Sequence, residues 1–229
     1  MDKASRISVR SWFSRGWSTY KRNPRPLIGA NLILAAGGLL SLFALPWGSL
    51  LYISVILPPL WVGSLSLSLR LVRGQDVAIS EVFVGFSHFG KAWITYALFG
   101  LIAGAGFVLL VIPGIIWALK YSFGFFAVLD RSLSPRAALR FSGKITQGYK
   151  GKLLGAGLAA MALILPFFLL FQLAIERGEL LTPPGILGIL LYVVGVFVIG
   201  PWINASYASV YDTLVAVYEE NGTPKEVAS

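Results

Sequence analysis

Cysteine is absent from the 229 residues, histidine occurs once, and only 13% of the residues are charged. The absence of cysteine excludes disulfides and thiolate chemistry, and a single histidine excludes a metal site built from a histidine cluster. Soluble domains carry about twice this share of charge. No long stretch of mixed composition remains from which a separate soluble domain could fold. We therefore expect a single integral membrane domain over 1–229.

Long uncharged runs take the place of the missing charges. Leu27 to Leu69 contains no charge over 43 residues, and Ala92 to Leu129 contains only Lys120 over 38. About 20 apolar helical residues cross the hydrocarbon core once, so each run predicts two crossings. Pro113 and Gly114 lie near the middle of the second run. Proline lacks the backbone N–H and glycine tolerates the φ values that end a helix, so the turn is expected there.

The other apolar segments complete the predicted fold. We expect six crossings, at about 27–45, at 50–71, twice within 92–129, at 153–175 and at 186–208. They form an all-α polytopic bundle of three hairpins over 27–218, followed by a polar tail over 219–229. Gly200-Pro201 should break the last crossing, and Asp212 is expected at or just past its end.

The first 26 residues carry seven basic residues and one acidic residue. On a helical wheel, Trp12, Phe13, Trp17 and Tyr20 fall on one side and most of the cations on the other. This pattern is typical of a basic amphipathic helix lying in the headgroup layer. A solvated charged tail is the alternative.

A second basic helix is expected after the central hairpin, because serine followed by proline at Ser134-Pro135 is typical of a helix start. Arg136, Arg140 and Lys144 then recur every four residues, and Lys150 and Lys152 follow. Like charges at this spacing repel one another in an isolated helix. The row is favourable if it rests against lipid phosphates, and a merely solvated basic face is the alternative.

The net charge of +9 does not indicate nucleic acid, because the cations flank apolar spans. That placement predicts anionic membrane lipids as partners and no nucleic acid. Of the 19 Lys and Arg residues, 17 fall on one side of the predicted topology. The positive-inside rule then places both termini and both basic loops in the cytoplasm.

Lys120 is the one ionisable residue within a predicted crossing, and such residues are candidates for function. It lies about 9 Å along a helix from the expected turn at Gly114. It can snorkel to the outer surface or pair structurally, or it can contact a substrate in the bundle interior, near Ser122, Asn204 or Glu176. Asp130 is expected either to form a local salt bridge with Arg136 or Arg140 or to be a simple carboxylate at a loop start.

No paired carboxylates, Ser-His-Asp set, phosphate-binding glycine loop or metal-ligand spacing can be assembled from the sequence. We therefore expect a non-enzymatic protein without a cofactor or metal. Three functions remain open. The first is binding of anionic lipid or a membrane partner by the basic helices. The second is a small transporter or channel that uses Lys120 and helices kinked at Pro58-Pro59, Pro166 and Pro201. The third is an auxiliary subunit of an envelope complex, as a homo-oligomer or with a membrane protein partner.

A longer motif carries a family resemblance. It consists of Val111-Ile112-Pro113-Gly114 with Trp117 and Lys120-Tyr121-Ser122, then Asp130, then Ser134 to Ser142 and Thr146-x-Gly148. It resembles a group of uncharacterised bacterial six-helix membrane proteins related to the membrane domain of some glycerophosphodiester phosphodiesterases. The resemblance implies a bacterial inner-membrane location. It implies no catalytic residues, because the positions that these proteins share have no agreed role. The phosphodiesterase domain is missing from this sequence, so the resemblance does not imply hydrolytic activity.

Overall fold

A computed structural model describes residues 7–43, 47–178 and 182–221, and all regular structure within these ranges is helical. The all-α prediction is therefore confirmed. The first six residues of the predicted basic segment and most of the predicted polar tail lie outside the described residues. Glu219 and Glu220, which were assigned to that tail, belong to the last helix.

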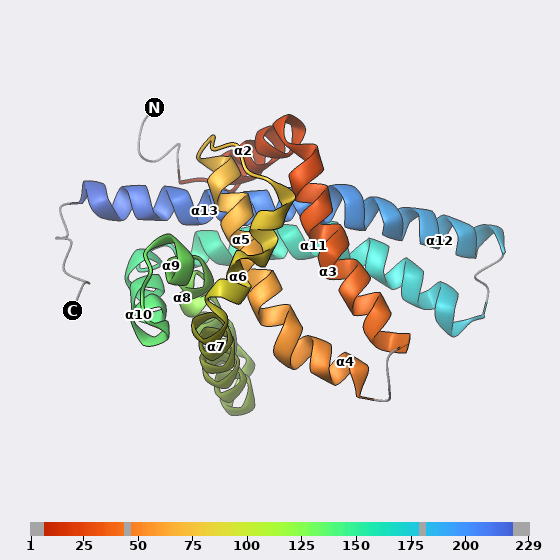
Figure 1. The fold of residues 1–229 in the computed structure, drawn as a ribbon, viewed down its shortest axis with the longest axis horizontal. Coiled ribbons are helices and arrows are strands. Elements are labelled where there is room, and N and C mark those ends of the chain that lie inside the picture. The colour runs from red at the N-terminus through yellow and green to blue at the C-terminus, as the bar shows by residue number, and fades with distance from the viewer. Residues whose placement is uncertain (1–6, 44–46, 179–181, 222–229) are drawn as a thin grey trace.

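Three helical hairpins follow one another along the chain (Figure 1). The first comprises α3 (Pro24–Phe43), α4 (Gly48–Leu51), the π-helical η1 (Tyr52–Ile56) and α5 (Leu57–Val72). The second comprises α7 (Phe89–Leu109), α8 (Val111–Tyr121) and α9 (Gly124–Asp130). The third comprises α11 (Lys150–Glu176), α12 (Pro183–Val194), the π-helical η3 (Gly195–Ile199) and α13 (Gly200–Glu220).

Shorter helices lead into each hairpin. They are α2 (Val9–Arg22), the 3₁₀ turn η2 (Ile79–Phe83) with α6 (Val84–Ser87), and α10 (Pro135–Ile145). Ser134 precedes α10 in an extended conformation and Pro135 opens the helix, as the sequence predicts. Proline suits this position because the first backbone N–H groups of a helix have no intrahelical partner.

Within residues 7–43, 47–178 and 182–221, five helical segments are long and apolar enough to cross a membrane, which indicates a helical membrane protein. They are Gly48–Val72, Phe89–Leu109, Val111–Asp130, Lys150–Leu170 and Pro183–Glu220. The crossing expected at about 27–45 forms the helix α3 but is not among these five. The count of six crossings therefore remains a prediction.

The turn of the central hairpin lies three residues before the predicted site. Helix α7 ends at Leu109, Leu110 is extended, and Pro113 lies in the first turn of α8. Proline is tolerated there because its missing N–H would have no partner. Gly114 is buried, and a Cβ at this residue would lie 2.6 Å from the ring of Phe107. Pro113 and Gly114 therefore allow the two helices to approach closely just after the turn.

The predicted break at Gly200-Pro201 is not present. The chain stays helical from Pro183 to Glu220, with the π-helical η3 directly before Gly200 and Pro201. Proline cannot donate to the carbonyl four residues earlier and its ring clashes with that group, and a wider π turn accommodates it. Because this helix continues, Asp212 lies in the interior of α13 and not at its end.

The amphipathic helix α2 packs on protein. Trp12 is 1% exposed, and α2 lies against α13. At the crossing, a Cβ on Gly16 would lie 2.1 Å from the hydroxyl of Ser206, so only glycine permits this contact. The apolar face that was expected to rest on lipid is therefore partly covered by protein at Trp12, while Trp17 on the same face is 37% exposed.

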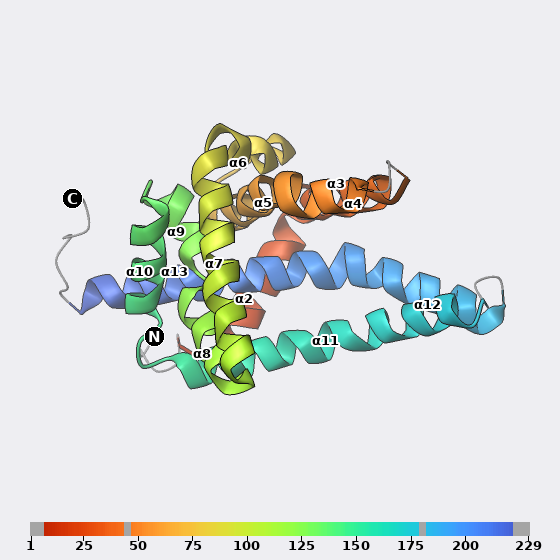
Figure 2. The ribbon, with the colours of Figure 1, turned by 90° about the horizontal axis from the view of Figure 1, so that it is seen from below.

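Packing is densest at one end of the molecule, where α2, α5, α9, α10 and α13 meet. From there the three hairpins extend in different directions, and their tips lie far apart in both views (Figures 1 and 2). Large apolar side chains at the tips are exposed, with Val108 at 89%. Such exposure is expected of side chains that face hydrocarbon.

Candidate anion site

A network of ion pairs joins the helices at the densely packed end, which we call the charged end. Arg73, just after α5, forms a two-bond contact with Asp130 at the end of α9. Its Nε also donates to Asp212 in α13 at 2.9 Å, and Arg15 in α2 donates to the other oxygen of Asp212 at 2.7 Å. Tyr211 donates its hydroxyl to Asp130 at 2.9 Å. Four segments far apart in sequence are thereby joined.

This network corrects the predicted partner of Asp130, which is Arg73 and not Arg136 or Arg140. Nearby, Arg131 pairs with Glu219. Burial by itself would lower the pKa of the Arg73 guanidinium, but its hydrogen bonds to Asp130 and Asp212 and their charges raise that pKa above its usual value. Arg73 therefore stays charged, and its positive charge is balanced within the protein.

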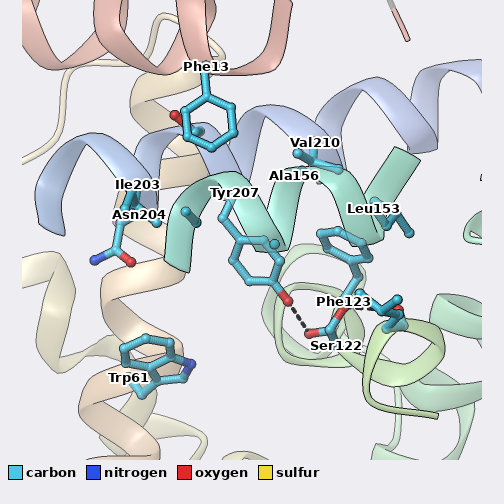
Figure 3. Close-up of a pocket in the computed structure, with 14 residues that line it drawn as sticks. Phe13, Trp61, Ser122, Phe123, Leu153, Ala156, Ile203, Asn204, Tyr207 and Val210 are labelled. Carbon is cyan, nitrogen blue, oxygen red and sulfur yellow. Dashed lines mark hydrogen bonds between the residues drawn. The ribbon is translucent and has the colours of Figure 1, made fainter. Parts of the chain in front are cut away.

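A second polar arrangement holds the interruption between α8 and α9. The backbone N–H of Phe123 donates to the hydroxyl of Ser142 at 3.1 Å, and that hydroxyl donates to the carbonyl of Lys120 at 2.7 Å. Tyr207 donates to the carbonyl of Ser122 at 2.8 Å (Figure 3). Interrupted helices are tolerated in membranes only where other groups satisfy the freed backbone atoms. Side chains from α10 and α13 do so here.

The interruption leaves Lys120 beside the basic helix α10. Gly143 of that helix makes room for it, since a Cβ there would lie 3.0 Å from Cε of Lys120. The turn at Leu110 puts Lys120 about 15 Å along α8 from the tip, farther than the sequence predicted. The structure therefore places Lys120 beside α10, and whether it snorkels to the outer surface stays a prediction.

Lys120, Arg140, Lys144 and Lys150 line one hollow of about 430 Å³ together with Gln147 and Tyr121. We call this hollow the basic pocket. Its cations come from three helices, α8, α10 and α11. Within the described part of the chain, none of the four forms an ion pair with a carboxylate. Arg15, Arg70, Arg73 and Arg131 all do, so the structure separates balanced cations from unbalanced ones.

The two remaining predicted contact residues lie outside the basic pocket. Arg136 is exposed one turn before Arg140. Lys152 donates its ammonium group to the carbonyl of Ile7 at 2.8 Å and so fixes the chain ahead of α2. Among the described residues, no group of three His, Asp or Glu side chains could hold a metal ion.

Sequence reasoning missed Ser142, Thr146 and Tyr207 as residues that hold the α8–α9 interruption. Ser142 of α10 and Thr146, the residue directly after that helix, both bond to the carbonyl of Lys120. The sequence contains a pattern that could have identified Ser142 and Thr146, because these polar residues recur on the apolar side of a basic helix. Comparisons of the chain with known protein families, with curated proteins and with solved structures found no match.

Proposed function

We propose that this membrane protein is non-enzymatic and that it holds a phosphate-bearing anionic lipid headgroup in the basic pocket. The observation that carries the proposal is the convergence of four cations from three helices without a carboxylate among the described residues. Like charges brought together in this way repel one another. A bound anion removes the repulsion and adds charge-assisted hydrogen bonds.

The chemistry of the pocket suits a phosphate. Arg140 offers a planar fork of donors, and the lysines add rotatable point charges. Basic pockets between transmembrane helices are common headgroup sites on the cytoplasmic side. The positive-inside rule supports the same side for this pocket, and the family resemblance supports a bacterial inner membrane, so we place the pocket at the cytoplasmic face of that membrane.

The test is lipid binding by the purified full chain in detergent. Native mass spectrometry would measure retention of added phosphatidylglycerol. Zwitterionic phosphatidylcholine, which has no net charge, is the comparison lipid. The test variant carries Lys120→Gln, Arg140→Gln and Lys144→Gln. A hydrogen bond to a charged group contributes about 1.5–3 kcal/mol, so losing three should weaken phosphatidylglycerol binding at least a hundredfold, roughly.

A matched control removes three cations outside the pocket. Arg10, Arg22 and Arg25 are exposed and have no carboxylate partner among the described residues. Replacing these three by glutamine lowers the net charge by the same amount as the test variant and should weaken phosphatidylglycerol binding far less. If both triple variants lost binding equally, general charge attraction would explain it. If neither lost binding, the pocket would not be a lipid site.

A small transporter is the second candidate, and the interruption of the second hairpin favours it. Ser122 and Phe123 separate α8 from α9, and π-helical segments precede Pro58 and Pro201. Interrupted helices and π turns occur often at functional sites in membrane proteins. Flux of anions into liposomes containing the purified protein would support transport, and its loss in Lys120→Gln would assign it to this pocket.

A further inference from the structure

Two hollows lined mainly by apolar side chains lie between the hairpins and share Trp61, and we treat them as two parts of one groove. Its first part, about 240 Å³, lies between α5, α8, α11 and α13 and is closed by Phe13 of α2. Its second part, about 360 Å³, continues between α3, α5, α11 and η3. Trp61 lines both parts, and α11 passes from Ala160 in the first to Ile164 in the second within one turn. We call the whole the inter-hairpin groove.

One polar side chain in this groove has no partner. Asn204 is 9% exposed, and within the described residues its side-chain amide makes no hydrogen bond. Figure 3 shows that amide directed from α13 toward the side of the groove where Trp61 lies. The neighbouring hydroxyls of Ser206 and Tyr207 are both bonded to backbone carbonyls. Because this amide lines the groove, it can bond to a polar group of a ligand there.

The groove begins next to the basic pocket. Leu119 lines the groove and Lys120 the pocket, on adjacent positions of α8. On α11, Lys150 lines the pocket and Leu153, one turn further, lines the groove. The cations of the basic pocket are therefore followed by the apolar side chains Leu119 and Leu153, and Asn204 lies deeper in the groove, on the side of Trp61 (Figure 3).

We infer that the inter-hairpin groove takes an acyl chain of the same lipid whose headgroup the basic pocket holds, and that Asn204 donates to the ester carbonyl of that chain. The inference rests on the proposed function. A basic pocket that leads into an apolar groove with one polar side chain suits a phospholipid, which joins a phosphate to hydrocarbon chains through ester groups. Phe13, Trp61 and Phe167 supply apolar walls for the chain. An unoccupied groove in a bilayer would fill with lipid chains in any case, since water there lacks polar partners.

The first experiment fills the groove. Gly157→Leu adds a side chain from a position where a Cβ meets no atom within 4 Å, so folding should be preserved. Ala160→Phe is a second, independent filler. Ala162→Phe on the same helix is exposed and does not line the groove, which makes it the control. Both fillers should weaken phosphatidylglycerol binding about tenfold or more, while Ala162→Phe leaves it unchanged.

The second experiment varies the ligand. Glycerol phosphate carries the same charge chemistry without chains, so it should bind far more weakly than phosphatidylglycerol and should not respond to the groove fillers. Ether-linked phosphatidylglycerol lacks the ester carbonyls. It should bind about fivefold more weakly than the ester-linked lipid, which corresponds to one hydrogen bond. Asn204→Leu should abolish this preference, and its melting temperature in detergent would verify that it is folded.

The outcomes separate this inference from the proposed function. If the fillers and Asn204→Leu are without effect while the Lys120, Arg140 and Lys144 variant loses binding, the groove is not the chain site and the basic pocket stands alone. Equal binding of glycerol phosphate and phosphatidylglycerol would also overturn the inference, because the ligand would then be a free phosphate compound. If all variants bind like the wild type, both the inference and the proposed function fail.

Discussion

Replacing Ser142 by alanine tests whether the interruption between α8 and α9 is held by one side chain. The Ser142 hydroxyl is fully buried, accepts from the N–H of Phe123 at 3.1 Å and donates to the carbonyl of Lys120 at 2.7 Å. Alanine removes both bonds without adding volume. The carbonyl of Lys120 keeps a bond from Thr146 at 3.3 Å, but the N–H of Phe123 has no other acceptor in the described structure.

The magnitude follows from that orphaned N–H. A buried donor without a partner costs about 1–3 kcal/mol, whereas an average side-chain hydrogen bond between membrane helices contributes about 0.6 kcal/mol. We therefore expect Ser142→Ala to destabilise the protein by about 2 kcal/mol, dominated by the N–H of Phe123. For a chain of this size, that corresponds to a fall in melting temperature of about 4–8 °C.

Ser209→Ala provides the comparison. Ser209 is also fully buried and helical, but its hydroxyl donates only to the carbonyl of Ala205 one turn earlier on α13. That carbonyl keeps its helical partner, so the change should cost less than about 1 kcal/mol. Thermal unfolding of both variants in the same detergent measures the difference. Equal melting temperatures for Ser142→Ala and Ser209→Ala would refute the role assigned to Ser142.

Three further predictions concern the charged end and α2. Arg73→Gln should lower the free energy of unfolding by about 2 kcal/mol, a value between those of exposed and buried ion pairs, because the side chain of Arg73 is 32% exposed and that of Asp130 is 12%. Arg70→Gln breaks a more exposed pair with Glu81 and should lower it less. The reverse order in the same unfolding assay would contradict this prediction. The pKa of Arg73 is raised in the folded protein. Its contribution to stability is therefore complete below the pKa that Arg73 has in the unfolded chain, and it is lost only as pH rises through the raised value. The excess stability of the wild type over Arg73→Gln should stay constant from about pH 7 to pH 9. Gly16→Ala forces α2 off α13 and should lower the melting temperature strongly, whereas Gly104→Ala, where a Cβ meets no atom within 4 Å, should be neutral or slightly stabilising.

The hairpins were predictable because they depend on composition alone. Uncharged runs such as Leu27 to Leu69 are long enough for two crossings whatever their neighbours are. The exact turns were not predictable to the residue. Pro113 is compatible both with a turn and with the first turn of a helix, and the close contact of Gly114 with Phe107, which decides between them, involves the partner helix.

The candidate site was predictable in its residue types but not in its pairing. Periodicity identified Arg136, Arg140 and Lys144 as one row, because all lie on the same helix. It could not reveal that Lys120 joins two of them, since this depends on the interruption after Tyr121. The pairing of Asp130 with Arg73 spans 57 residues, and local spacing carries no information about it.

The division of charges would let stability coexist with the proposed lipid binding in a chain with splayed hairpins. Each returning segment brings at least one charge to the network: Arg73 after α5, Asp130 in α9 and Asp212 in α13. Together with Arg15 of α2 these charges sum to zero, so the charged end can hold the hairpins together without a ligand. The third hairpin packs most loosely, since only 6% of the residues in the apolar stretch of Lys150–Leu170 are buried, against 50% in Gly48–Val72. A lipid bound between the basic pocket and the groove would contact α5, α8, α11 and α13 together, so binding should stabilise the loosely packed hairpins while leaving the charged end unchanged. Hydrogen exchange should therefore slow in α11 on addition of phosphatidylglycerol, and slowing confined to α9 and the end of α13 would contradict this arrangement.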